Sequence, residues 1–91
     1  MGNGFRWNGW NVEHVGKHGV TPEEAEAVVL NAQRPYPSYE GDGKFLVRGQ
    51  AWDGRFLQVV YIVDDDGETL YGIHARPMTD KEKRSWRRRQ R

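Results

Sequence analysis

A histidine and an arginine stand two positions apart near the end of the chain, at His74 and Arg76. Both lie in a segment typical of a strand, and residues two apart in a strand project from the same face of the sheet. Arg48 and Arg55 come from neighbouring parts of the same predicted sheet and could approach that face. The sequence therefore predicts a cationic face that also carries an imidazole.

Two further cationic residues, Lys17 and His18, end a predicted helix, where the helix dipole favours positive charge. Together with the first group they suit metal-independent cleavage of a phosphodiester. Attack by a neighbouring 2′-hydroxyl needs a base to take its proton, an acid to protonate the leaving oxygen, and fixed cations around the transition state. Histidine serves either proton role near neutral pH, and arginine binds phosphate through two hydrogen bonds.

Other residues are candidates for holding RNA rather than cutting it. Exposed aromatic side chains stack on unpaired bases, and Tyr61 is one candidate, although its strand face could be buried. The expected phosphate contacts are arginines of the sheet and of the C-terminal segment: Arg48, Arg84, Arg87 and Arg88. The sequence has no Gly-rich phosphate loop and no His/Cys cluster at metal-ligand spacing, so neither a cofactor nor a metal is expected.

Each candidate also has a purely structural interpretation, and these alternatives stay open at this point. His18, directly before Gly19, could simply cap helix carbonyls. Arg55, directly after an Asp-Gly pair, could be a solvated turn residue, and His14 fits an exposed helix face. An ion pair with Glu40 or with a helix acid could account for Arg76.

The segment that must position these residues is the apolar run 55–63 (RFLQVVYIV), bracketed by the Asp-Gly turn signals at 53–54 and 66–67. It is apolar on nearly both faces, which predicts the middle strand of a sheet. Residues 44–51 and 69–77 are the expected antiparallel neighbours. A short edge strand is expected around 36–39, and Phe5 to Trp7 form a short strand or an extended lead-in.

Helix signals surround these strands. A short helix is expected over 10–17, and a second helix has Thr21 as N-cap, Pro22 at its first position and Glu24 closing a capping box, with its end near Ala32. Thr79 and Glu82 form another capping box ahead of a third helix, whose obvious apolar residue is Trp86. The predicted fold class is α+β: a small antiparallel sheet of three to four strands flanked by two N-terminal helices and one C-terminal helix, with the helices on one side of the sheet.

Length and charge bound the organisation of the chain. Its 91 residues make a single domain, 1–91, with a basic C-terminal helix or tail over 79–91. That tail carries seven Lys or Arg against two acids, whereas the other 78 residues carry seven against eleven. A basic tail on an acidic body suggests an anionic partner such as nucleic acid, or else a solvated terminus. Without cysteine, signal peptide or membrane-spanning run, the chain is expected to be cytoplasmic and not bound to a membrane.

Four motifs, in this order and spacing, resemble the BrnT family over nearly the whole chain, from Phe5 to about Arg88. They are F-R-W-N at 5–8, K-H-G-V at 17–20 followed by T-P-E-E-A, D-G-R at 53–55, and I-H-A-R-P-M-T at 73–79. The resemblance implies a RelE-like fold and the toxin of a type II toxin–antitoxin module, an endoribonuclease that cleaves mRNA without a metal. It also implies a cognate antitoxin as partner. The complex would bind operator DNA only through the antitoxin and not through this chain.

By position, the resemblance carries the family's basic residues onto Lys17, His18, Arg55 and Arg76. Two departures stand out: Asn8 where many members have Asp, and His74 where many have Ser. The first leaves a residue that can still cap a helix, and the second adds an imidazole beside the key arginine. The leading hypothesis is an active ribonuclease with His74 as general acid or base. The alternatives are an inactive homologue that binds antitoxin or RNA, and a small DNA-binding protein, although no helix-turn-helix pattern supports the latter.

Overall fold

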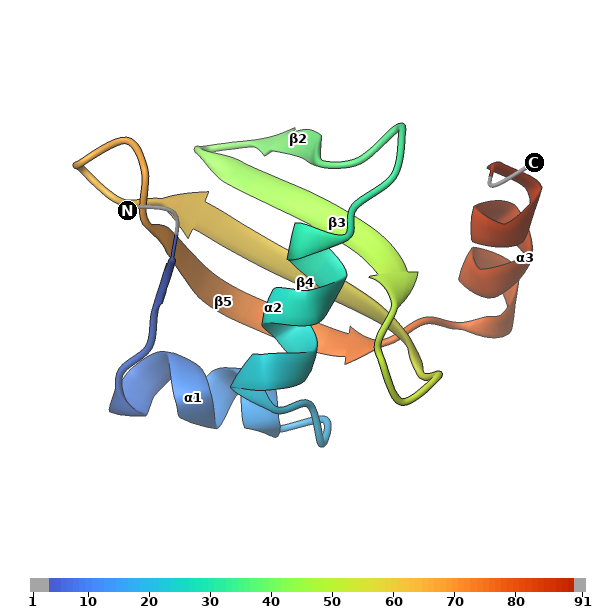
Figure 1. Cartoon of the computed structure of the whole chain (residues 1–91), viewed down its shortest axis with the longest axis horizontal. Coiled ribbons are helices and arrows are strands. Elements are labelled where there is room, and N and C mark those ends of the chain that lie inside the picture. Colours follow the sequence, from blue (N-terminus) through green and yellow to red (C-terminus); the bar gives the residue numbers. More distant parts are fainter. Residues whose placement is uncertain (1–3, 90–91) are drawn as a thin grey trace.

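The structure is a computed structural model that describes residues 4–89, with five strands in one sheet in the order β1-β5-β4-β3-β2 (Figure 1). The strands are β1 (Phe5–Arg6), β2 (Ser38–Gly41), β3 (Lys44–Gln50), β4 (Phe56–Val63) and β5 (Leu70–Pro77). The helices are α1 (Gly9–Gly16), α2 (Pro22–Leu30) and α3 (Asp80–Arg89). This arrangement confirms the α+β class.

The apolar run is the middle strand, as its composition predicts. β4 pairs antiparallel with both β3 and β5. Its side chains alternate, so Leu57, Val59 and Tyr61 face the core while Phe56, Gln58 and Val60 point to the other side. Both flanking turns place a glycine at positive φ, with Gly54 at 93° and Gly67 at 75°.

The core lies between the sheet and the first two helices. Val15 of α1 and Ala25 and Val28 of α2 pack with Val47 of β3 and with the core-facing side of β4. Asn8 and Thr21 cap these helices through reciprocal capping boxes, which confirms the predicted start of α2 and shows that Asn8 serves as an N-cap. None of the helices in residues 4–89 is long and apolar enough to cross a membrane.

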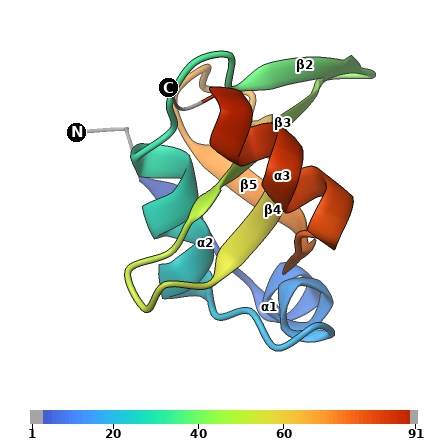
Figure 2. The same cartoon turned by 90° about the vertical axis from the view of Figure 1, so that its right-hand side faces the viewer.

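Two features differ from the expected architecture. The sheet has five strands rather than three or four, because the lead-in residues Phe5 and Arg6 pair parallel with Leu70 and Tyr71 of β5. So short a strand forms only because a distant strand pairs with it, and the sequence around Phe5 and Arg6 therefore gives little indication of it. The helices also do not share one side, since α3 lies across the face opposite α2 (Figure 2).

Candidate nucleic-acid site on the outer face of the sheet

Most of the predicted site lies on the sheet face opposite α2, which we call the outer face. Its residues are identified by cross-strand pairs, because directly paired residues share a face. His74 pairs with Val60, Arg76 with Gln58, and Gln58 with Arg48 on its other side. The prediction that His74 and Arg76 project from one face, with Arg48 close by, is therefore confirmed.

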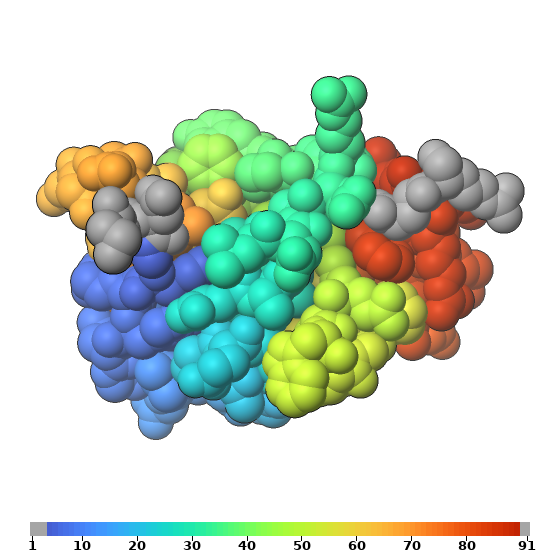
Figure 3. Space-filling model, viewed as in Figure 1, coloured from blue at the N-terminus to red at the C-terminus, as the bar shows by residue number. Residues whose placement is uncertain are grey.

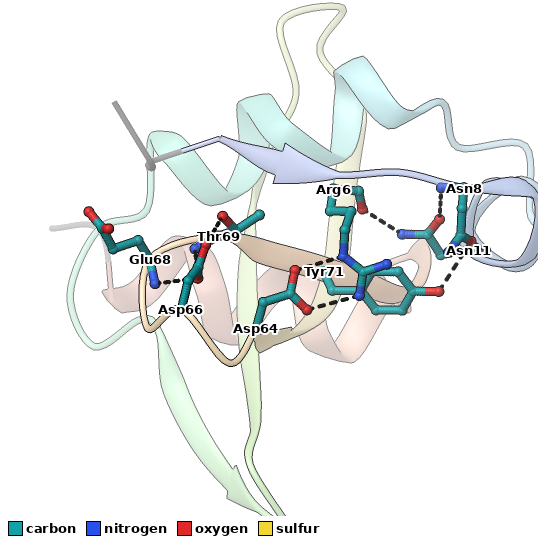
Figure 4. Close-up of polar contacts among 8 residues, drawn as sticks. All are labelled: Arg6, Asn8, Asn11, Asp64, Asp66, Glu68, Thr69 and Tyr71. Atoms are coloured by element: carbon teal, nitrogen blue, oxygen red, sulfur yellow. Dashed lines mark hydrogen bonds and ion pairs between the residues drawn. The ribbon is translucent and has the colours of Figure 1, made fainter.

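The start of α1 is fixed beside β5 by polar contacts at the N-terminal edge of the sheet (Figure 4). Arg6 donates two hydrogen bonds to Asp64, at 2.7 and 2.9 Å, and its guanidinium lies 4.1 Å from the Tyr71 ring centroid. The Tyr71 hydroxyl donates to the Asn8 side chain at 3.2 Å, so the helix cap is bonded to the strand. The bonds from Arg6 lower the pKa of Asp64. These contacts set the position from which α1 runs along β5.

The far end of α1 brings a second imidazole to the site. β1 pairs only with Leu70 and Tyr71, so β5 is the edge strand at His74, and the turn after α1 reaches it there. The rings of His18 and His74 meet edge to face, with centroids 5.8 Å apart and planes at 74°. His18 is exposed and His74 is partly buried. Lys17, beside His18, is exposed at the same helix end.

The environment of His74 favours its neutral form. Burial lowers the pKa of His74 below the ordinary 6.5, and the positive charges of His18, Arg76 and His14 lower it further. A neutral imidazole at pH 7 has a free nitrogen that can accept a proton. The arrangement thus supplies a base beside a second histidine and an arginine.

The guanidinium of Arg76 is held by a carboxylate of the C-terminal helix. Arg76 donates to both oxygens of Glu82 at 2.8 Å, and Arg48 donates to the same carboxylate at 3.2 Å and to the Gln58 side chain at 2.9 Å. The hydrogen bonds from Arg76 are the main cause that lowers the pKa of Glu82 to about 2. The interpretation of Arg76 as the partner of a helix acid is therefore confirmed, and the acid is Glu82.

Arg55 does not join this group, which corrects the expectation that it approaches the outer face. Its Nη1 donates to the backbone oxygen of Gly19 at 2.9 Å and to Glu24 at 3.2 and 3.3 Å. The space-filling view shows the turn of residues 51–55 lying against the start of α2 (Figure 3). Arg55 thereby ties the turn that carries His18 to the end of the sheet, a positioning contact rather than a phosphate contact.

Tyr61 is also placed away from the site. It is 7% exposed, faces the core and packs against Phe5 and Phe45, and burial raises the pKa of its hydroxyl. A base cannot stack on a ring in this position, so the expectation that Tyr61 contacts RNA is corrected. The alternation of the strand already placed Tyr61 on the same side as Leu57 and Val59.

The remaining candidates lie on or beside α3. Arg84, Arg87 and Arg88 are exposed, and the Arg87 guanidinium lies 4.9 Å from the Phe56 ring centroid. A groove of about 300 Å³ opens between this helix and β2, lined by residues that include Tyr36, Arg48 and Arg89. The outer face therefore carries arginines both on the sheet and on the helix that crosses it, with Glu40 also lining the groove and Glu82 paired with Arg48 and Arg76.

Sequence reasoning missed two parts of this region. Glu82 was identified only as a capping residue, and its Oε1 does accept from the Thr79 backbone at 2.8 Å, but the same carboxylate also holds the two arginines. The spacing of Trp10 and His14, four apart on one helix, was an available signal for their contact, and their rings stack at 3.8 Å. His14 therefore lies within a planar stack rather than on a plain solvated face.

Across residues 4–89, no three His, Asp or Glu side chains gather in an arrangement that could hold a metal ion. The chain matches no protein-family model, no curated protein and no solved structure.

Proposed function

We propose that this chain is a BrnT-like endoribonuclease toxin that cleaves mRNA without a metal and restrains growth until an antitoxin neutralises it. The observation that carries the proposal is the contact between His18 and His74, with Arg76 on the same sheet face. Two imidazoles in contact can divide the two proton transfers of RNA cleavage, and an adjacent guanidinium can stabilise the charge on phosphorus.

The proposed step assigns a role to each group. Neutral His74 takes the proton of the 2′-hydroxyl as its oxygen bonds to phosphorus. The bond from phosphorus to the 5′-oxygen breaks, and protonated His18 gives that oxygen a proton, leaving a 2′,3′-cyclic phosphate and a 5′-hydroxyl. Arg76 and Arg48 face the phosphate oxygens, and Lys17 adds positive charge at the His18 end.

The basic helix would extend the contact beyond the cleaved bond. Arg84, Arg87 and Arg88 are exposed on α3 and suit phosphates on either side of the reacting one. The same surface suits an acidic antitoxin segment, which would neutralise the toxin by covering these cations. Operator DNA would then be bound through the antitoxin.

The test is growth after induction of this chain, with total RNA resolved on a gel. We expect wild-type protein and Arg34→Ala, which removes an exposed loop arginine, to arrest growth and degrade RNA. The double variant His74→Ala/Arg76→Ala should do neither while remaining soluble and cooperatively folded. Full toxicity of the folded double variant would overturn the proposed site.

A second candidate function is an inactive homologue that binds RNA or an antitoxin without cutting. The specific observation in its favour is that Glu82 and Glu24 already hold the two arginines expected at a phosphate, Arg76 and Arg55. Normal growth and intact RNA with wild-type protein that still retains RNA would support this candidate and refute the ribonuclease.

A further inference from the structure

The outer face contains an anion site whose occupant comes from the chain itself. The site consists of the guanidinium groups of Arg48 and Arg76, and the occupant is the Glu82 carboxylate. The fork between Arg76 and Glu82, with both bonds at 2.8 Å, has the geometry in which arginine also binds a phosphate. A phosphodiester at this site would therefore compete with Glu82 for the same donors.

The helix that supplies Glu82 is held by few contacts. None of its residues is buried over Asp80–Arg89. Its contacts with an aromatic ring all involve Phe56: Trp86 meets it edge to face with ring centroids 5.6 Å apart, and the Lys83 and Arg87 cations lie 5.8 and 4.9 Å from its centroid. The connection just before α3 is firm, since Met78 is buried and its N–H donates to the Phe56 oxygen at 2.9 Å. Moving the helix about Thr79 would therefore break none of the strand pairing of the sheet.

Charge makes Glu82 the decisive contact. Over Asp80–Arg89 the helix has six Lys or Arg against two acids, and it lies beside two further arginines. The like charges of the helix and of these two arginines repel one another, and the carboxylate of Glu82 offsets this repulsion. An RNA strand would bind both the sheet arginines and the helix. One phosphate would contact Arg48 and Arg76, and other phosphates would contact the basic residues of the helix.

We propose that α3 is a built-in cover for this anion site, and that a phosphodiester of single-stranded RNA displaces Glu82 and frees the helix to bind flanking phosphates. The ligand class rests on the proposed function, whereas the cover itself rests on the contacts of Glu82. A positioning role for Glu82, in which it holds Arg76 ready for phosphate, would give the opposite sign when the carboxylate is removed.

The experiment measures binding of a fluorescent, fully 2′-O-methylated pentauridine to the full chain by anisotropy at low salt. This RNA cannot be cleaved, because its 2′-oxygens are blocked. Glu82→Gln should bind it about five- to tenfold more tightly than wild type, the factor expected for losing a competing, partly exposed ion pair. Asp80→Asn is the matched control, since it changes the charge of the same helix turn equally but leaves the arginines paired, and it should bind within about twofold of wild type.

Two further measurements keep the inference open to refutation if Glu82→Gln folds poorly. Trp86→Ala removes the edge-to-face contact of the helix with Phe56 and should also strengthen binding. The contact between the Trp86 and Phe56 rings, whose centroids lie 5.6 Å apart, should be lost in wild-type protein when the RNA saturates it, and NMR cross-relaxation (NOEs) between the two rings measures this. Binding by Glu82→Gln no tighter than by Asp80→Asn, or NOEs between the Trp86 and Phe56 rings that persist in the saturated wild type, would refute the proposal that α3 covers the anion site.

Failure of the cover and failure of the ribonuclease remain distinguishable. Neither RNA binding nor the loss of the Trp86–Phe56 contact depends on cleavage, so an inactive protein can still show the effect of Glu82→Gln. A toxic, RNA-degrading protein whose Glu82→Gln variant binds like Asp80→Asn would refute the cover alone. Absence of RNA binding by every variant would overturn the assigned ligand.

Discussion

Arg55→Ala separates a positioning role from a catalytic one. Glu24 is 5% exposed, and its carboxylate accepts from the Thr21 backbone at 3.0 Å and from Arg55 at 3.2 and 3.3 Å. Removing the guanidinium leaves a nearly buried carboxylate without its cation and the Gly19 oxygen without its donor. We therefore expect Arg55→Ala to lower the stability of the fold directly, and to affect the candidate site only through the turn that carries His18.

The expected loss of stability in Arg55→Ala follows from how exposed the ion pair of Arg55 and Glu24 is. Two opposite charges about 4 Å apart attract by about 4 kcal/mol at the effective dielectric constant near a protein surface. The Arg55 side chain is 37% exposed, so water recovers part of this when the partner is lost. We expect a loss of about 2 kcal/mol in the free energy of unfolding, or a drop of about 10 °C in Tm for a domain of this size.

The assay is urea denaturation of four proteins: wild type, Arg55→Ala, Glu24→Gln and the double variant. If the two side chains act as a pair, the double variant should lose clearly less than the sum of the single losses. RNA cleavage by Arg55→Ala should fall less than cleavage by Arg76→Ala and should recover partly in Arg55→Lys. A loss below about 0.5 kcal/mol, with activity as low as in Arg76→Ala, would refute the positioning role.

Three more predictions concern Glu82, His74 and Gly72. The folded-state pKa of Glu82 is about 2, below its ordinary 4.5, so ionised Glu82 stabilises the fold fully above about pH 4.5 and loses this effect as the pH drops toward 2. After solvent screening we expect its contribution to the free energy of unfolding to be about 1–2 kcal/mol. Acid titration followed by circular dichroism measures it. His18→Asn should raise the pKa of His74, because one of the positive charges that lower it is removed, and an NMR titration of the His74 ring measures this. Gly72→Ala should destabilise the fold by about 1–3 kcal/mol in thermal denaturation, because the added Cβ would lie 2.8 Å from Cη2 of Trp7.

Each of these predictions has a control within the chain. Glu82→Gln should flatten the acid titration relative to wild type, and an unchanged curve would contradict the assignment to Glu82. An unmoved His74 titration in His18→Asn would show that the charge of His18 does not contribute to the lowered pKa of that ring. Gly16→Ala, where an added Cβ meets nothing within 4 Å, should leave the fold as stable or stabilise it, so a similar loss in both glycine variants would exclude the contact with Trp7 as the cause.

Local patterns in the sequence determined the elements and one face of the site. The capping boxes at Thr21 and Thr79 and the apolar run of β4 act between near neighbours, so each is readable without the fold. The two-residue spacing of His74 and Arg76 likewise fixed their common face, because strand alternation is a local property.

The tertiary structure decided which side chains meet across the chain. The ring contact of His18 with His74 depends on how α1 lies along β5, and the pairing of Arg55 with Glu24 depends on where the β3–β4 turn lies against α2. Glu82 shows most clearly what the sequence alone cannot predict. Its capping role is local, whereas its bond with Arg48 joins residues 34 positions apart. An arginine and a glutamate can pair wherever folding brings them together, and no spacing along the chain encodes that choice.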